Sequence, residues 1–339
     1  MADMITVKDL VEVYADGTKA VDGISFDVPE GEFFGFLGPN GAGKSTTIKV
    51  LTTLLKKTSG KVSVAGFDID SSASEIRKVI GVQAQETVLD PDLTGRENLT
   101  LQCHLQQMHN DVIAGRVEEL LKLIELDTVA DRRAGNYSGG MKKRLDLASA
   151  LVHNPKLLFL DEPTTGLDPQ SRAKIWEYLE RLNKEEKKTI FLTTQYMEEA
   201  DKLCNDLYIM DHGKVIANGS PAELKRRVGA DAITVSVVNG DSSDVKSKAK
   251  DVLTGIKGVT KVVEADGGLT AYAPDASSLV AQVVRVFDDN SIGLSSINLS
   301  RPSLDDVFLE HTGRRIRVEE ATSKSGSIGR WGARRQARE

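Results

Sequence analysis

The segment from Gly38 to Ser45 constrains this chain more than any other. It reads Gly-Pro-Asn-Gly-Ala-Gly-Lys-Ser and lies between an apolar run, Phe33–Leu37, and a helical pattern that begins at Lys44. Glycines at these spacings let the backbone curl until consecutive N–H groups face inward and cradle phosphate oxygens. The start of the following helix adds the positive end of its dipole. The pattern predicts an α/β fold with a phosphate-binding loop between a buried strand and a helix.

Two side chains of this loop have predicted chemical roles. Lys44 is expected to bridge the β- and γ-phosphates of a nucleotide, and the Ser45 hydroxyl is expected to bind Mg²⁺. The alternative is a glycine-rich turn that merely precedes a helix. The full eight-residue pattern in a strand–loop–helix context disfavours that alternative.

Length and composition limit the remaining possibilities. At 339 residues the chain is too long for one compact domain. The net charge of −6 offers no overall basic excess, so no nucleic-acid partner is expected. The two cysteines, Cys103 and Cys204, indicate neither a zinc site nor a disulfide framework, which fits a reducing compartment. No apolar run approaches the ~20 residues that span a bilayer. Any passage across a membrane must therefore come from another chain.

Short apolar runs alternate with helical patterns over residues 1–228, which favours a largely parallel central sheet. The segment of about 86–150 is instead helical and predicts an inserted helical subdomain. A hairpin turn is expected at Asp211-His212-Gly213. Helix starts are marked by Thr94 with Glu97, by Ser220 with Glu223, and by Asp168-Pro169. The expected strands include Phe33–Leu37, Lys61–Ala65, Val79–Gln83, Leu157–Leu160 and Thr189–Thr193.

Residues 229–312 form a second predicted unit, a small ferredoxin-like α+β domain, because their elements follow the order β-α-β-β-α-β. A structural or dimerising role and a ligand-sensing role both stay open for it. A short helix is expected after Ser303. Residues 313–339 are basic and poor in apolar side chains, which predicts a disordered tail. Attraction of this tail to anionic lipids, aided by Trp331, is the alternative.

Two further motifs accompany the loop. The strand Leu157–Leu160 is followed by Asp161 and Glu162, at the end where open α/β sheets bind ligands. Asp161 is predicted to hold Mg²⁺, mostly through water, and Glu162 to act as general base toward the attacking water. The other motif begins at Ser138, 23 residues before Asp161. Ser138 is a natural helix N-cap, and the glycines that follow it leave helix-start N–H groups open to an anion.

The loop, Ser138-Gly139-Gly140 and Asp161-Glu162, in this order, resemble the nucleotide-binding subunits of ABC transporters over roughly residues 4–225. The resemblance implies a RecA-like core, an N-terminal antiparallel β subdomain, a helical subdomain, and ATP with Mg²⁺ as ligands. The implied ATP contacts are Tyr14, Gly38, Pro39, Asn40, Gly41, Ala42, Gly43, Lys44, Ser45, Thr46, Gln85, Ser138, Gly139, Gly140 and Asp168. The implied metal ligands are Ser45, Gln85 and Asp161, and the implied catalytic residues are Lys44, Glu162 and Gln195.

Four of these positions depend on the resemblance alone. Tyr14, expected on an early strand, would stack on adenine, and the alternative is a core aromatic. Gln85 would touch Mg²⁺ and sense a membrane partner, with Gln83 as the alternative position. Asp168 would meet the opposite subunit. Gln195 stands where the family usually has a histidine at the γ-phosphate; an amide can donate a hydrogen bond there but cannot carry a proton.

Finer details resemble the daunorubicin-resistance branch of exporter ATPases: the run from Tyr137 to Met141 with the basic residues after it, Gln195 in place of the histidine, and the ending Leu304–Leu309. The branch implies a head-to-tail dimer, with a homodimer favoured, that drives export of a hydrophobic drug or lipid through a separate polytopic permease. It implies a peripheral location at the cytoplasmic face of the cell membrane. A soluble ABC ATPase without transport and an importer subunit remain the alternatives.

Overall fold

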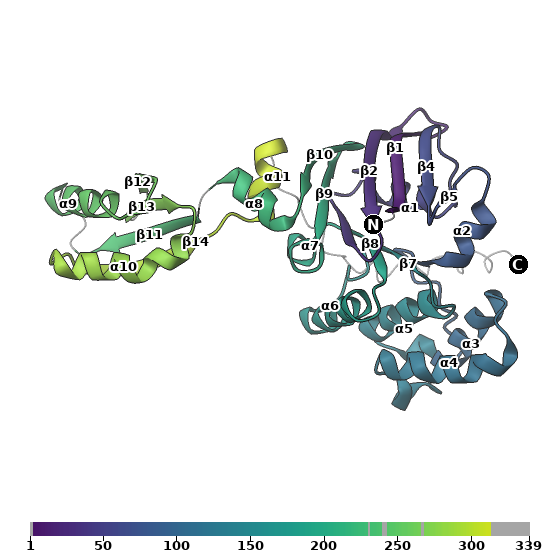
Figure 1. Ribbon diagram of the computed structural model, residues 1–339. Coiled ribbons are helices and arrows are strands. Elements are labelled where there is room, and N and C mark those ends of the chain that lie inside the picture. Colours follow the sequence, from purple (N-terminus) through teal and green to yellow (C-terminus); the bar gives the residue numbers. More distant parts are fainter. Residues whose placement is uncertain (1–2, 230, 239–242, 266–267, 313–339) are drawn as a thin grey trace, which may run out of the picture.

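The computed structural model describes residues 3–229, 231–238, 243–265 and 268–312. Within them the strands form three sheets, two in the predicted nucleotide-binding part and one in the C-terminal part (Figure 1). None of the helices in these ranges is both long and apolar enough to span a bilayer. The predicted boundaries at residues 228 and 312 stay predictions, and the predicted tail, residues 313–339, lies outside the described ranges.

A six-stranded sheet forms the centre of the larger part, in the order β10-β9-β3-β8-β7-β6. Its strands are β3 (Phe33–Leu37), β6 (Ile80–Gln83), β7 (Leu157–Asp161), β8 (Thr189–Thr194), β9 (Asp206–Asp211) and β10 (Lys214–Gly219). All but β10 run parallel to their neighbours. Every residue of β3, β7 and β8 is buried, because a parallel sheet is covered on both faces. The predicted parallel core is confirmed.

An antiparallel sheet, in the order β2-β1-β4-β5, lies beside this core. It comprises β1 (Asp3–Val13), β2 (Lys19–Pro29), β4 (Ser59–Val64) and β5 (Phe67–Asp68). Helices α1 (Lys44–Leu51) and α2 (Ala73–Val79) accompany it, and Val79 therefore ends a helix instead of starting the predicted strand. The placement of Tyr14 on a strand was wrong. β1 ends at Val13, and Tyr14 belongs to a turn closed by hydrogen bonds with Thr18 and Gly17.

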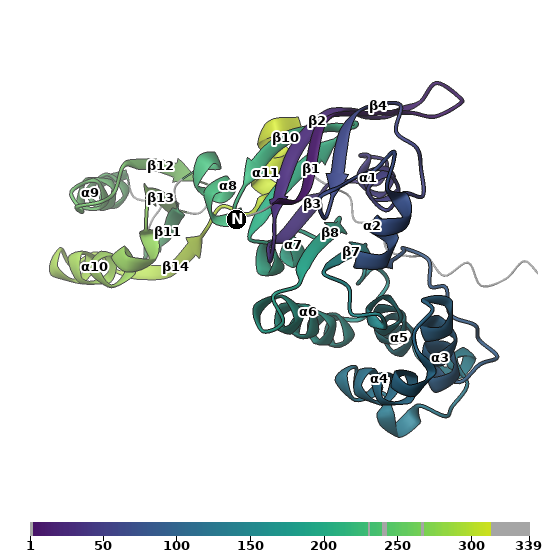
Figure 2. The ribbon, with the colours of Figure 1, turned by 45° about the vertical axis from the view of Figure 1, so that its right-hand side comes forward.

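Helices fill the chain between β6 and β7, as predicted. They are α3 (Gly95–Leu105), α4 (Asn110–Leu123), two 3₁₀ turns (Asp127–Val129 and Ala134–Asn136) and α5 (Gly139–Leu151). Figures 1 and 2 both show α3, α4 and α5 gathered on the far side of the six-stranded sheet from β1, β2 and β4. The remaining helices of this part are α6 (Pro169–Lys184), α7 (Met197–Leu203) and α8 (Pro221–Val228).

Local capping signals predict these helices well. The capping boxes at Thr94 and Ser220 are both present, and Asp168 caps α6 by accepting a hydrogen bond from the Ser171 N–H. His212 and Gly213 both have positive φ in the turn between β9 and β10, as a two-residue hairpin requires.

The C-terminal part has the strand order β12-β13-β11-β14, all antiparallel, which is the ferredoxin-like arrangement. Helices α9 and α10 cover one face and share a core with Ile233, Val235 and Leu269. The lobe stands apart from the two other sheets (Figures 1 and 2). Its elements are β11 (Asp231–Val237), α9 (Ser243–Thr254), β12 (Lys261–Ala265), β13 (Gly268–Ala273), α10 (Ala276–Asp289) and β14 (Leu294–Ser300), followed by α11 (Leu304–Thr312).

Candidate active site

The phosphate-binding loop connects β3 to α1, and its backbone needs glycine at the end of the loop. Gly43 has a φ of 103°, in the left-handed region, and a Cβ there would lie 2.4 Å from the Ala20 carbonyl oxygen. A Cβ on Gly38 would lie equally close to the Met210 carbonyl oxygen. The glycines therefore let the loop pass close to the neighbouring strands, where a residue with a Cβ would clash.

The Lys44 side chain is buried and points toward a carboxylate. Its ammonium donates to the carbonyls of Gly38 and Pro39, at 2.7 and 3.0 Å. It lies 3.4 Å from Oε1 of Glu162, and only 3% and 4% of the two side chains are exposed. Burial lowers the pKa of Lys44, and the Glu162 charge partly offsets this shift. A cation and an acid thus face each other at the mouth of the loop.

Asp161 ends β7 beside the Ser45 hydroxyl. Ser45 Oγ donates to Oδ1 of Asp161 at 3.1 Å, although the two residues are 116 positions apart. The Thr193 hydroxyl, from the adjacent strand β8, donates to the same oxygen at 2.5 Å. The parallel sheet therefore brings the two predicted metal ligands together at the ends of its strands.

Glu162 has an unusual backbone conformation for a residue with a side chain. Its φ is 50°, and its N–H donates to the Thr193 carbonyl at 3.0 Å. Its Oε2 accepts hydrogen bonds from the Thr165 hydroxyl at 3.2 Å and from the Gln85 amide at 3.5 Å. Such conformations persist where surrounding contacts over-determine them, and they gather at functional sites.

Lys44, Ser45, Gln85 and Glu162 take part in lining an open hollow of about 480 Å³. Tyr14 lies at its edge, about one third exposed, and its hydroxyl lies 3.0 Å from the Thr46 hydroxyl. The Tyr14 ring is therefore available to a planar ligand rather than part of a core. The lining residues are Tyr14, Thr18, Lys19, Ala20, Asn40, Gly41, Gly43, Lys44, Ser45, Thr46, Gln85, Glu162 and His212.

The oxygen atoms around Asp161 suit a magnesium ion. Within the described ranges, no group of three or more His, Cys, Asp or Glu side chains is placed to hold a metal. The predicted ligands instead combine the Ser45 hydroxyl, the Asp161 carboxylate and the Gln85 amide. These are hard oxygen donors of the kind that Mg²⁺ uses together with substrate phosphates and water. The residues present therefore fit the ion.

Comparison with known proteins supplies the deciding observation. Residues 21–165 match the family described as ABC transporter, and residues 219–312 match the one described as ATP-binding protein DrrA1-3-like, C-terminal domain. The chain is 41% identical to the daunorubicin resistance ATP-binding protein DrrA2 of Streptomyces coeruleorubidus, over 89% of this chain and 93% of the relative. This chain is an ABC ATP-binding protein with a DrrA-like C-terminal domain. As an ABC ATPase, it hydrolyses ATP as the ATP-binding subunit of a transporter.

Two other similarities accompany this match. The ABC ATP-binding protein is 36% identical to the linearmycin resistance ATP-binding protein LnrL of Bacillus subtilis, over 93% of this chain and all of the relative. A dimeric structure of the ATP-binding cassette MJ0796 in a post-hydrolysis state, bound to ADP and Pi, aligns with a TM-score of 0.59 and 29% identity. That alignment covers 64% of this chain and 98% of the cassette.

Ser138, Gly139 and Gly140, the signature residues of the ABC ATP-binding protein, are not among the residues that line the hollow. Ser138 caps α5 by accepting from the Met141 N–H at 3.2 Å, and Gly140 packs so closely on α6 that a Cβ would lie 2.5 Å from Ser171 Oγ. Asp168, at the start of α6, also lies outside the lining. Ser138, Gly139, Gly140 and Asp168 therefore form a separate group at two neighbouring helix starts.

Gln195 follows β8 and also lies outside the hollow lining. Its side chain is 2% exposed, and its Oε1 has no hydrogen-bond partner among the described residues. A buried amide oxygen without a partner is costly. The proximity of Gln195 to phosphate stays a prediction.

The sequence missed several contributors to the site. Thr193 fixes Asp161, and Thr165 fixes Glu162, but neither belongs to a recognised motif. Lys19 and His212 line the hollow because β2 and the β9–β10 turn pass beside the loop. Lys143, on α5, donates to the Gln85 carbonyl at 2.8 Å. The basic run after the signature was the only local signal for Lys143.

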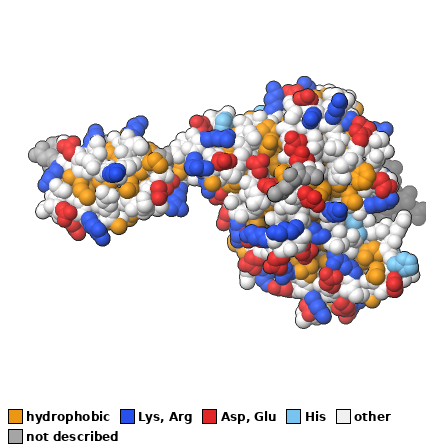
Figure 3. All heavy atoms as spheres, viewed as in Figure 1, with side chains coloured by type: hydrophobic (Ala, Val, Ile, Leu, Met, Phe, Trp, Pro, Cys, Tyr) orange, Lys and Arg blue, Asp and Glu red, His pale blue; other side chains and the backbone are white. Residues whose placement is uncertain are grey.

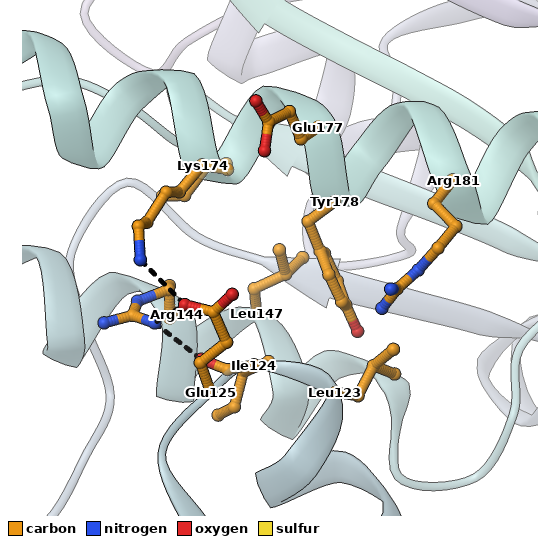
Figure 4. A pocket seen from close by; sticks show the side chains of 10 residues that line it. Leu123, Ile124, Glu125, Arg144, Leu147, Lys174, Glu177, Tyr178 and Arg181 are labelled. Atoms are coloured by element: carbon orange, nitrogen blue, oxygen red, sulfur yellow. Dashed lines mark hydrogen bonds and ion pairs between the residues drawn. The ribbon is translucent and has the colours of Figure 1, made fainter.

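A second, smaller hollow of about 110 Å³ lies between the end of α4, α5 and α6 (Figure 4). Glu125 lies 2.7 Å from the Lys174 ammonium and 3.6 Å from the Arg144 guanidinium, and Arg144 also donates to the Ile124 carbonyl at 2.7 Å. These charges already have partners. The contacts fix the signature helix α5 against its two neighbours.

Proposed function

We propose that this chain is the ATPase subunit of an exporter, working as a head-to-tail dimer on a separate polytopic permease at the cytoplasmic face of the membrane. The observation that carries the proposal is the separation of the site into two groups. Lys44, Ser45 and Glu162 line the hollow, whereas Ser138 caps a helix start outside that lining. A second subunit that presents its Ser138 end to this hollow would complete the site.

Electrostatic attraction is the physical reason for the two subunits to close on each other around ATP. The N–H groups at the start of α5 and the dipole of that helix attract an anion. In a head-to-tail dimer they would meet the γ-phosphate that Lys44 holds from the other side. Association of the two subunits would depend on that phosphate, so its cleavage and departure would release the dimer. The aligned cassette MJ0796 is dimeric in a post-hydrolysis state with ADP and Pi bound, which supports a dimer for this chain.

Within each site, Glu162 is the proposed general base. Its carboxylate lies at the hollow with one oxygen near Lys44 and the other near Thr165 and Gln85, which would orient it toward water. Bound Mg²⁺ would neutralise charge that develops on the phosphates. Ser45 and Asp161 would hold it, with Gln85 at its side.

The names of the relatives indicate which class of compound is transported. DrrA2 is named for daunorubicin resistance and LnrL for linearmycin resistance, and other relatives are named for Nod factor export. We therefore propose outward transport of an amphipathic or hydrophobic compound. The specificity pocket would lie in the permease.

Affinity capture of the full chain from detergent-solubilised membranes, followed by mass spectrometry, tests this proposal. We expect a stoichiometric partner with several spans of ~20 apolar residues each. Recovery of ribosomes or nucleic acid, or of no membrane protein, would instead support a soluble ABC ATPase. An importer would be indicated if the captured complex includes a substrate-binding protein.

A further inference from the structure

The loop that carries Gln85 has little packing of its own. The side chains from Ala84 to Val88 are all exposed, although they follow the buried Gln83 at the end of β6. An exposed loop of this kind samples many conformations unless polar contacts hold its backbone. Its orientation matters because the Gln85 amide reaches Glu162.

The signature helix α5 supplies such a contact. Lys143 is 9% exposed, and its ammonium donates to the Gln85 carbonyl at 2.8 Å. In return, the Gln83 amide donates to the Lys143 carbonyl at 3.4 Å. One residue of α5 is thus joined to the end of β6 through its backbone and to the following loop through its side chain.

Charge explains why a lysine can be buried here. Burial lowers the pKa of Lys143, while the carboxylates of Asp146, Asp161 and Glu162 oppose that shift. Asp146, one turn further along α5, is itself buried, and its Oδ2 has no hydrogen-bond partner among the described residues. Burial raises the pKa of Asp146. This rise is partly offset by the Lys143 charge and by polar contacts from the Val88 N–H and the Gln83 amide. The α5 helix therefore faces the loop at Gln85 and again at Val88.

The helix that makes these contacts is firmly held. Arg116 donates to the Leu151 and Val152 carbonyls at its C-terminal end, and Arg144 ties it to the end of α4 (Figure 4). Lys143 lies five residues after Ser138, about 7–8 Å along the helix axis. Any displacement of the Ser138 end would reach Lys143 through a rigid element.

We propose that Lys143 is a positioning residue for ATP hydrolysis, which fixes the backbone of Gln85 to the signature helix so that the amide stays at Glu162. This inference rests on the proposed role of Gln85 and extends it. Engagement of α5 by ATP on the opposite subunit would thereby set the Gln85 loop of its own subunit.

A double-mutant cycle on the full chain tests the inference, with the variants Lys143→Met, Gln85→Ala and both together. We expect each single change to lower kcat by about tenfold with the Kd for ATP changed less than about threefold. The double variant should be no slower than Gln85→Ala, because Lys143 acts through Gln85. Lys143→Arg should recover most of the activity, and Lys122→Met, on the exposed end of α4, is the matched control.

Amide hydrogen exchange gives a second readout without turnover. Exchange over residues 84–88 should rise by at least about threefold in Lys143→Met and stay unchanged in Lys122→Met. The inference would be overturned if the loss of kcat in the double variant equalled the product of the two single losses. Unchanged hydrogen exchange over residues 84–88 in Lys143→Met would also overturn it. Wild-type turnover in Gln85→Ala would contradict both the proposed role of Gln85 and this inference. It would not bear on the proposed role of Glu162 as general base.

Removal of the Lys143 charge leaves the buried Asp146 carboxylate without its cation, which can destabilise the fold. The variant Lys143→Met/Asp146→Asn removes both charges and keeps the shapes. Its melting temperature should lie close to wild type while kcat stays as low as in Lys143→Met. Recovery of full turnover in this neutral variant would show that only stability was affected and would contradict the inference.

Discussion

At the scale of single residues, Glu162 carries the strongest structural sign of function. A φ of 50° costs a residue with a Cβ about 1–3 kcal/mol. The strand neighbour Thr193 holds the N–H, and Lys44 and Thr165 hold the two carboxylate oxygens. A purely structural role would not need an acid in this strained position beside a buried lysine.

We predict that Glu162→Gln slows hydrolysis by about 10²–10⁴-fold, because an amide keeps the shape but cannot take a proton from water. ATP binding should be retained. Phosphate release and equilibrium binding of a fluorescent ATP analogue measure the two effects, with the exposed Glu177→Gln as control. Turnover near wild type would exclude Glu162 as the base.

The Gln195 amide is buried with an unpaired oxygen, and its N–H₂ group is the part that can donate a hydrogen bond to a phosphate. If that group donates to phosphate, Gln195→Ala should lower turnover by about 10–100-fold, the value of a hydrogen bond to a charged group. Gln195→His should be tolerated, since imidazole can also donate. Steady-state kinetics at saturating ATP decide between these outcomes, and full activity in the alanine variant would refute the sensing role.

At the scale of elements, the site depends on where helices begin. α1 begins at the phosphate-binding loop, α5 directly after its cap Ser138, and α6 directly after its cap Asp168. Ser138 and Asp168 each satisfy one N–H of their own helix, and the other N–H groups of the first turn need partners. Anionic ligands and partner subunits are suited to supply them.

Two serine caps allow the structural and functional roles of Ser138 to be separated. Ser138→Ala and Ser220→Ala each remove one cap, and each should cost about 1 kcal/mol in the free energy of unfolding. Only Ser138→Ala should lower ATP turnover, by about tenfold or more, because the Ser138 helix start, and not that of α8, is proposed to meet the γ-phosphate of the opposite subunit. Denaturant unfolding and phosphate release measure both. Equal activity losses in the two variants would show that stability alone is involved.

At the scale of the whole molecule, the chain leaves the ATPase part through α8, builds the ferredoxin-like lobe, and returns. Leu304, Val307 and Phe308 of α11 are buried in the same core as Leu224 of α8. The lobe is therefore tied to the ATPase part by two packed helices rather than by one linker. On the face seen in Figure 3, basic and acidic side chains are mixed over both parts.

The dimer predicted for the whole molecule should form only with intact ATP. We expect Glu162→Gln to elute as a dimer with ATP and Mg²⁺ and as a monomer with ADP, because the γ-phosphate links the two halves. Size-exclusion chromatography with light scattering measures this. Adding Ser138→Ala to this variant should weaken the ATP-bound dimer. The same molecular mass with ATP and with ADP would contradict a dimer that depends on the γ-phosphate.

The sequence by itself determined the features that local chemistry controls. The glycine spacing of residues 38–43, the caps at Thr94, Ser138 and Ser220, and the apolar run before Asp161 depend on near neighbours, and each appears in the structure as predicted. The resemblance added Gln85 and Tyr14, which no local pattern identifies. It could not place Tyr14 beyond the end of β1.

Only the tertiary structure decided which distant residues meet. Thr193 reaches Asp161 across a sheet, and Lys143 reaches Gln85 over 58 positions of the chain. Lys19 and His212 join the hollow because two hairpins pass beside it. Such contacts follow from strand order and helix packing, which summed burial determines and no short window of sequence contains. Local periodicity identifies the elements of this protein, whereas packing places its supporting side chains.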